Sequence, residues 1–89
     1  MQAFFPPVRI TREVYDYLFI DVPSGNTRGL EYSIHSPEGE MLRKGCFRGL
    51  STQLRLTHLP EGQYFLKLES GPEAYEEYQF VKRNPEQKR

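Results

Sequence analysis

The sequence predicts an all-β protein, an antiparallel β-sandwich of about seven short strands. Apolar and polar residues alternate with a period of two in most segments, which is typical of strands with one buried face. Turn-forming residues recur about every eight to twelve positions, as they do between the strands of a sandwich. Seven glycines and seven prolines among 89 residues leave no stretch long enough for an amphipathic helix.

The first two expected strands lie in the N-terminal quarter of the chain. A short strand is expected at residues 8–10. In the next strand, Leu18, Ile20 and Val22 share one parity and therefore one face of the sheet. The turn formers of residues 23–26 (Pro-Ser-Gly-Asn) end this strand.

The third and fourth strands are expected to form a hairpin. Leu30, Tyr32 and Ile34 alternate with polar residues up to the turn at 36–39, where proline presets φ and glycine supplies a positive φ. Residues 40–47 then resume an extended pattern. Strand, turn and strand follow one another without a gap, as in a hairpin.

The last three strands are expected at residues 52–57, 64–69 and 74–82. They are separated by Pro- and Gly-containing turns at 58–62 and 70–73. The inward parities of all these strands together define the expected core. That core consists of Leu18, Ile20, Leu30, Tyr32, Ile34, Leu54, Leu56, Tyr64, Leu66, Leu68 and Phe80.

Length and charge limit the classes of function. The chain has room for one domain, expected at residues 1–83, with a polar tail at 84–89. Twelve Lys and Arg balance twelve Asp and Glu, which argues against a nucleic-acid binder. No apolar run is long enough to span a membrane as a helix, and the N-terminus lacks the pattern of a secretory signal. We therefore expect a cytoplasmic protein if Met1 is the native start.

No catalytic or ligand-binding constellation is apparent in the sequence. His35 and His58 lie in different segments without metal-ligand spacing, so both are expected on the surface. Cys46 is the single cysteine, and the sequence does not suggest the combination of a basic partner and an orienting group that would activate it. The acidic clusters at 38–40 and 73–77 flank turns, where carboxylates face water. We expect a non-enzymatic protein with no cofactor and no metal.

The tyrosines suggest one further hypothesis. Tyr15 and Tyr17 with Phe19, or Tyr75 with Tyr78, have the spacing of an exposed aromatic platform that could stack on sugar rings. The favoured alternative is that these rings cover the second face of a small sandwich and stiffen its strands.

Three motifs in the last two-thirds of the chain carry a family resemblance. They are IHSPEGEML at 34–42, LRLTHLPEGQYFLKL at 54–68 and QFVK at 79–82. Their order and spacing resemble the C-terminal sorting domain of the type IX secretion system of Bacteroidetes over about residues 30–82. The Phe-Pro-Pro run at 5–7 also looks like a weakened form of that domain's opening.

The resemblance implies an immunoglobulin-like β-sandwich of about seven strands that serves as a sorting signal. Such a domain is carried behind a folded cargo and is recognised by protein partners of the export machinery in the outer membrane. In many members a sortase-like protease then removes it. A fragment of this kind would be found in the periplasm or at the cell surface. The motif positions that the resemblance transfers are Gly39, Leu59, Gly62, Tyr64, Phe80, Val81 and Lys82.

The same motif positions also have a local physical interpretation. Leu59 is an apolar plug before a turn, Gly62 allows the backbone of that turn, and Tyr64 can bury its ring with its hydroxyl bonded near the turn. An alternative function is therefore a standalone β-sandwich interaction protein of unknown partner, dimerising through a strand edge. Since no cargo domain is seen and the chain continues at 83–89, it is expected to be either an excised sorting domain or such a standalone relative.

Overall fold

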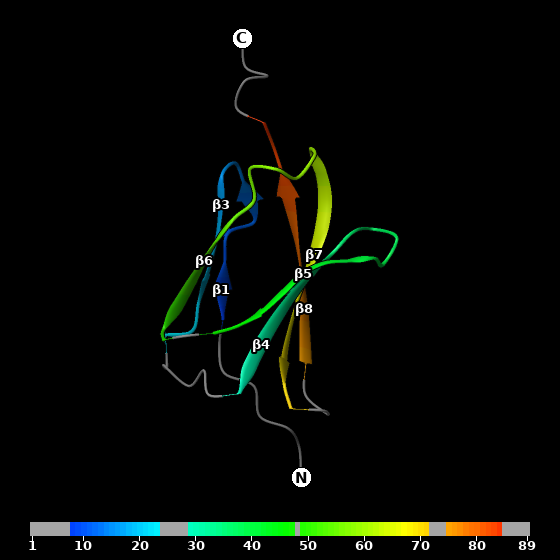
Figure 1. The fold of residues 1–89 in the computed structure, drawn as a ribbon. Coiled ribbons are helices and arrows are strands. Elements are labelled where there is room, and N and C mark those ends of the chain that lie inside the picture. The colour runs from blue at the N-terminus through cyan, green and yellow to red at the C-terminus, as the bar shows by residue number, and fades with distance from the viewer. Residues whose placement is uncertain (1–7, 24–28, 48, 72–74, 85–89) are drawn as a thin grey trace.

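The computed structural model describes residues 8–23, 29–47, 49–71 and 75–84, and these residues form a β-sandwich (Figure 1). The expected all-β fold is confirmed, with eight short strands in two sheets and no helix in the described ranges. The strands are β1 (Arg9–Ile10), β2 (Glu13–Val14), β3 (Tyr17–Asp21), β4 (Leu30–His35), β5 (Met41–Cys46), β6 (Ser51–Arg55), β7 (Gly62–Ser70) and β8 (Tyr75–Lys82).

The strand order is that of an immunoglobulin-like sandwich. One sheet has the order β1-β3-β6 and the other the order β2-β8-β7-β4-β5. Strands β3 and β6 correspond to strands B and E of the immunoglobulin fold, and β4, β7 and β8 to strands C, F and G. Figure 1 shows β3 and β6 on one side of the molecule and β4, β7 and β8 on the other.

The first strands of the chain require a correction to the expected topology. The chain passes from β1 in one sheet to β2 in the other and returns to the first sheet at β3. Strand β2 runs parallel to β8, so the sandwich is not antiparallel throughout, and the eight strands agree with the expected number of about seven. The sequence did not indicate β2 because a pair of residues is too short to show a period of two. Its pairing is fixed by backbone hydrogen bonds from Val81 N–H to Arg12 O (2.9 Å) and from Arg83 N–H to Val14 O (2.8 Å).

The other strands lie where the alternation of apolar residues predicted them, within two residues at each end. All of the expected core residues are buried, and Val14, Val22 and Phe47 join them. Val14 enters the core because β2 crosses between the sheets. The hydrophobic effect therefore selects the alternating face of each strand, as the sequence indicated.

The packing of β5 depends on an aromatic side chain from β4. Tyr32 and Gly45 are direct cross-strand partners, and a Cβ atom on Gly45 would lie 2.3 Å from the Tyr32 hydroxyl oxygen. The ring of Tyr32 meets Phe47 edge to face, with ring centroids 6.0 Å apart. The missing side chain of Gly45 thus makes room for the tyrosine, which covers this part of the strand.

Candidate functional site

The corner between β6 and β7 is built by one tyrosine. The Tyr64 hydroxyl donates a hydrogen bond to the carbonyl oxygen of Pro60 (2.7 Å), while its ring is buried in the core. This is the tyrosine corner of immunoglobulin-like sandwiches, in which a side chain holds the chain reversal before strand F. Burial and, secondly, the negative charge of Glu38 raise the pKa of Tyr64. The sequence-based expectation of a buried ring with a hydroxyl bonded near the turn is confirmed.

We expect Tyr64→Phe to destabilise the domain by about 1 kcal/mol, because it removes this hydrogen bond and leaves the ring in place. Urea denaturation of the purified domain measures the change. Tyr17→Phe is the matched control, since Tyr17 is exposed and its hydroxyl makes no hydrogen bond within the described residues. Equal losses of stability in Tyr64→Phe and Tyr17→Phe would show that the hydrogen bond from Tyr64 to Pro60 O does not stabilise the domain.

Gly62 begins β7 with a φ of 150°, in a region that residues with a side chain rarely adopt. A Cβ atom at this position would meet no heavy atom within 4 Å. The turn therefore needs glycine for its backbone conformation and not for space.

Gly62→Val is expected to cost about 1–3 kcal/mol through backbone strain alone. Because the position has open space around it, Gly62→Ala should cost nearly as much, and thermal melting of the two variants tests this. A small loss of stability for Gly62→Ala together with a large loss for Gly62→Val would instead indicate steric crowding at this position.

The closing segment of β8 completes the same corner. Phe80 stacks on Tyr64, with ring centroids 5.8 Å apart and an interplanar angle of 22°, and the two residues are direct cross-strand partners. Gly62 lies opposite Lys82 in the same register. Leu59 packs against the core at the end of β6, where its N–H donates to Leu56 O (3.1 Å). The structure thus brings together motif residues from two separate segments.

Lys82 is buried, which the sequence did not indicate. Only 1% of the residue is exposed, and its ammonium group donates to Asn84 Oδ1 (3.2 Å) and Arg83 O (3.4 Å). Asn84 N–H in turn donates to a carboxylate oxygen of Glu61 (3.2 Å), and Arg83 pairs with Glu13. These contacts tie the end of β8 to both neighbouring segments. Residues 85–89 of the expected tail and the run at 5–7 lie outside the described residues.

Gly39 lies apart from this corner, in the turn between β4 and β5. It has a φ of 94°, and its N–H donates to Ser36 O (2.9 Å).

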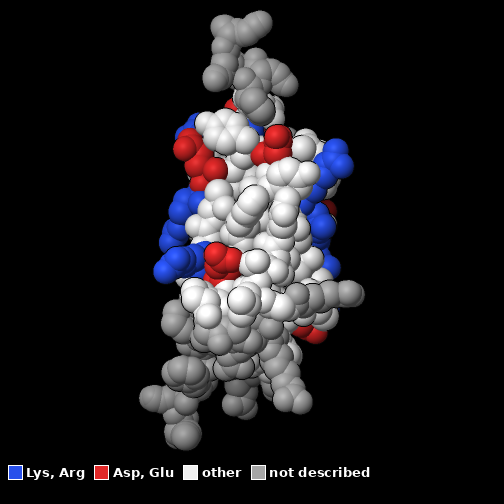
Figure 2. All heavy atoms as spheres, turned by 90° about the vertical axis from the view of Figure 1, so that its left-hand side faces the viewer, with Lys and Arg blue, Asp and Glu red and all other residues white. Residues whose placement is uncertain are grey.

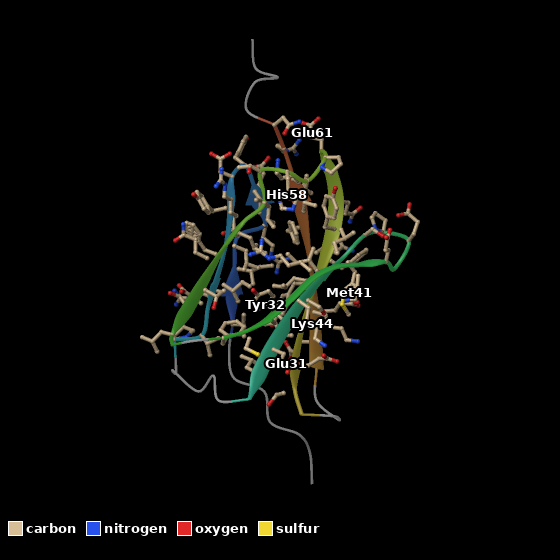
Figure 3. The ribbon with its side chains drawn as sticks, viewed as in Figure 1. Glu31, Tyr32, Met41, Lys44, His58 and Glu61 are labelled. Atoms are coloured by element: carbon tan, nitrogen blue, oxygen red, sulfur yellow. The ribbon has the colours of Figure 1, made fainter. Side chains whose placement is uncertain are left out.

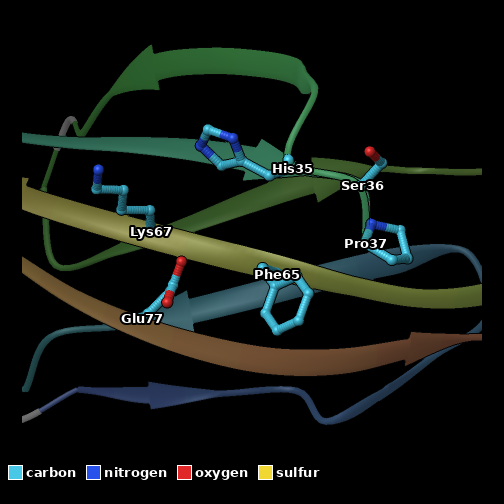
Figure 4. Close-up of a pocket in the computed structure, with 7 residues that line it drawn as sticks. His35, Ser36, Pro37, Phe65, Lys67 and Glu77 are labelled. Atoms are coloured by element: carbon cyan, nitrogen blue, oxygen red, sulfur yellow. The ribbon is translucent and has the colours of Figure 1, made fainter.

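A hollow of about 320 Å³ opens beside this turn on the outer face of the larger sheet (Figure 4). Its lining residues are His35, Ser36, Pro37, Gly39, Phe65, Lys67 and Glu77. In Figure 4 the Glu77 carboxylate points toward β7, which carries Lys67 and Phe65. This volume lies at the lower end of the range of about 300–1,000 Å³ that small-molecule sites occupy.

The histidines and the cysteine lie in three separate places. His35 is half-buried with its Nε2 2.9 Å from Ser33 Oγ, and His58 is exposed in the β6–β7 turn (Figure 3). Cys46 is a free, exposed thiol on β5. Within the described residues, no group of three or more His, Cys, Asp or Glu side chains is placed to hold a metal ion. The described chain also contains no helix that could span a membrane.

The aromatic residues of β3 lie on the outer face of the smaller sheet. Tyr17 and Phe19 are exposed, with ring centroids 6.2 Å apart and planes at 74°. Figure 2 shows this face with a mostly uncharged centre, Lys and Arg side chains along both sides, and Asp or Glu side chains among them and near the upper end. Two nearly perpendicular rings do not form a flat platform of the kind that stacks on a sugar chain. The side chain of Tyr75 lies outside the described residues, and Tyr78 is half-buried.

Tyr78 gives the domain an alkaline pH dependence. Burial, followed by the hydrogen bond to Glu76 (2.7 Å) and the charge of that carboxylate, raises the pKa of Tyr78 to about 12. An unfolded tyrosine ionises near pH 10, so the folded state holds this proton more tightly. The stabilising contribution is fully present below pH 10 and is lost as the pH rises through 12. Thermal melting across this window should show a falling Tm, and Tyr78→Phe should flatten the curve, whereas Tyr17→Phe should not.

Comparison with known proteins gives no evidence about function. No family model, curated protein or solved structure matches it. The surfaces that the fold leaves open to a partner therefore have to be judged by their exposure, backbone pairing and charge.

Strand β5 is the longest open edge in the described part of the sandwich. Strands β1 and β2 have two residues each, and the edge of β6 is capped where Arg43 Nη1 donates to Arg55 O (3.0 Å). Strand β5 has six residues, and β4 is the one strand paired with it. Met41 and Leu42 are 53% and 39% exposed at its start, beside the hollow at Gly39. The β4–β5 hairpin therefore carries both an open edge and a hollow.

Proposed function

We propose that this domain is a non-enzymatic protein-recognition module that acts as a C-terminal sorting domain, directing a cargo protein across the outer membrane. The observation that supports the proposal is the assembly of the motif residues into one corner. Tyr64 and Phe80 stack there, Gly62 lies opposite Lys82, and Leu59 packs against the hydrophobic core. Segments that resemble sorting domains in sequence thus act as one structural unit.

Three of the motif residues are buried, so their contribution to recognition is indirect. Tyr64, Phe80 and Lys82 fix the shape of the corner and the position of β8 between β2 and β7. A partner would contact the outward side of this unit, where Val81 is half-exposed and Gln63 is exposed as its cross-strand neighbour. The Gly39 turn and its hollow add a second exposed feature on the larger sheet.

A reporter fusion tests the proposal. A secreted reporter carrying this domain at its C-terminus is expressed in a host with the type IX machinery, and its location is measured by cell-surface labelling. We expect surface delivery of the parent fusion and reduced delivery of Val81→Glu, which changes the outward side of the corner while the buried residues stay in place. Tyr17→Thr, on the other sheet, is the matched control and should be delivered normally.

Retention of a folded, protease-resistant fusion in the periplasm would contradict the sorting role. The alternative function would then apply, a standalone interaction protein that uses the open edge of β5. That alternative is favoured by the exposure of Met41 and Leu42 on an edge strand, because such residues are the ones a partner strand covers.

A further inference from the structure

We propose that the open edge of β5 binds an extended, acidic segment of a partner protein, which adds a strand to the five-stranded sheet. The inference rests on the proposed role in protein recognition, but it does not depend on export. It follows from three properties of β5: the direction of its backbone groups, the character of its exposed side chains, and the charges that oppose pairing with a second copy.

The backbone of β5 offers unpaired hydrogen-bonding groups. Phe47 N–H donates to Leu30 O (3.2 Å), and in an antiparallel ladder the residues that bond to a given neighbour alternate along the strand. Gly45, two positions before Phe47, therefore directs its backbone groups toward β4. Lys44 and Cys46 direct theirs away from β4, toward the side where no described strand pairs. An added strand would bond to these two residues.

The exposed side chains of β5 define the partner's chemistry. Met41 and Leu42 form an apolar start to the strand, and the exposed Lys44 follows them (Figure 3). Arg43 lies on the opposite face of the strand, where its Nη1 donates to Arg55 O, so Lys44 is the cation presented to a partner, and the strand contains no acidic residue. A partner strand that alternates carboxylates with aliphatic side chains complements this edge in both respects.

Pairing with a second copy of β5 is opposed by the same charges. Two copies related by a two-fold axis would pair this strand antiparallel. If the axis passes through Lys44, each Lys44 faces the other, and if it passes through Arg43, each Arg43 faces the other. Like charges in direct opposition destabilise a strand pair. An axis through Leu42 or through Gly45 avoids this, but then the paired stretch shrinks to residues 41–43 or 44–46. The edge is therefore better suited to an acidic strand than to itself.

Two acetylated hexapeptides test the proposal on the intact domain. One is acidic, Thr-Glu-Val-Glu-Leu-Thr, and the other replaces both glutamates with lysine. Chemical shifts of the ¹⁵N-labelled domain locate binding, and the rate at which iodoacetamide alkylates the Cys46 thiol reports coverage of the edge. We expect the acidic peptide to shift the amides of Lys44 and Cys46 and to slow alkylation several-fold, and the basic peptide to do neither.

Charge reversal at one position provides the matched variant. Lys44→Glu should lose the response to the acidic peptide and gain a response to the basic one, with an unchanged melting curve because Lys44 is exposed. Arg9→Glu, on the edge strand of the other sheet, is the control and should leave the β5 response intact.

Several results would overturn the inference. Equal binding of both peptides would show that charge does not select the partner, and shifts centred on Tyr17 and Phe19 would place the acidic segment on the other sheet. An edge that is protected without peptide, together with a dimer in sedimentation, would assign the edge to a second copy. The export assay is separate: loss of peptide binding with normal surface delivery rejects only the acidic strand, and retained binding without delivery rejects only the sorting role.

Discussion

Phe80→Ala is expected to destabilise the domain by about 3–5 kcal/mol. Phe80 is 1% exposed, stacks on Tyr64 and lies in β8, which is hydrogen-bonded on both sides. Removing its ring leaves a cavity between the corner tyrosine and the opposite sheet, and neighbours held in two strand ladders have little freedom to fill it. Since domains are stable by only about 5–15 kcal/mol, this loss removes a large share of the stability, and the variant should melt well below the parent.

Chemical denaturation of Phe80→Ala and its controls measures this effect. Phe19→Ala removes the same ring from a position that is 46% exposed and should cost less than about 0.5 kcal/mol. Phe80→Leu keeps most of the buried volume and should fall between the two. Similar losses at Phe80 and Phe19 would mean that the stack with Tyr64 does not lie in the stabilising core.

Leu56→Ala is the second large effect, with an expected loss of about 2–5 kcal/mol. Leu56 follows β6 and is 1% exposed. Its backbone anchors the loop on both sides, because its N–H donates to Asp16 O (2.8 Å) and its carbonyl accepts from Leu59 N–H (3.1 Å). These backbone bonds survive the substitution, so the measured loss reports the side chain alone.

Leu50→Ala is the matched control for this experiment, since Leu50 is 59% exposed in the loop before β6. Its melting temperature should stay near that of the parent domain. A folded Leu56→Ala variant with unchanged melting would remove this residue from the core and would require a different packing of the two sheets.

The sequence predicted the parts of the fold that short-range alternation encodes. In β3, the buried Leu18 and Ile20 alternate with exposed residues. The sequence of this strand alone therefore indicates which of its two faces is buried. The Tyr64–Pro60 bond was also predictable, because both partners lie within the same turn. Positive φ at Gly62 follows from the same local geometry.

The remaining features depend on contacts between distant segments. Val14 is buried only because β2 crosses to the sheet that contains β8. Lys82 is buried because Asn84 and the Arg83 carbonyl reach its ammonium group, which no pattern of apolar residues indicates. Strand β5 has an open edge because it comes last in the order β2-β8-β7-β4-β5, and the sequence of a single strand does not indicate that order. The candidate partner site on the open edge of β5 could therefore not be predicted from the sequence.

The parallel pairing of β2 with β8 also determines how the domain responds to tension. The chain enters β2 from its N-terminal side and leaves β8 at its C-terminal end, so a pull on the two ends drags these parallel strands in opposite directions along their length. The bonds from Val81 to Arg12 and from Arg83 to Val14 then carry the force together, in shear, instead of opening one after another as in a peeled hairpin. Strands β2 and β8 thus form a mechanical clamp within the five-stranded sheet.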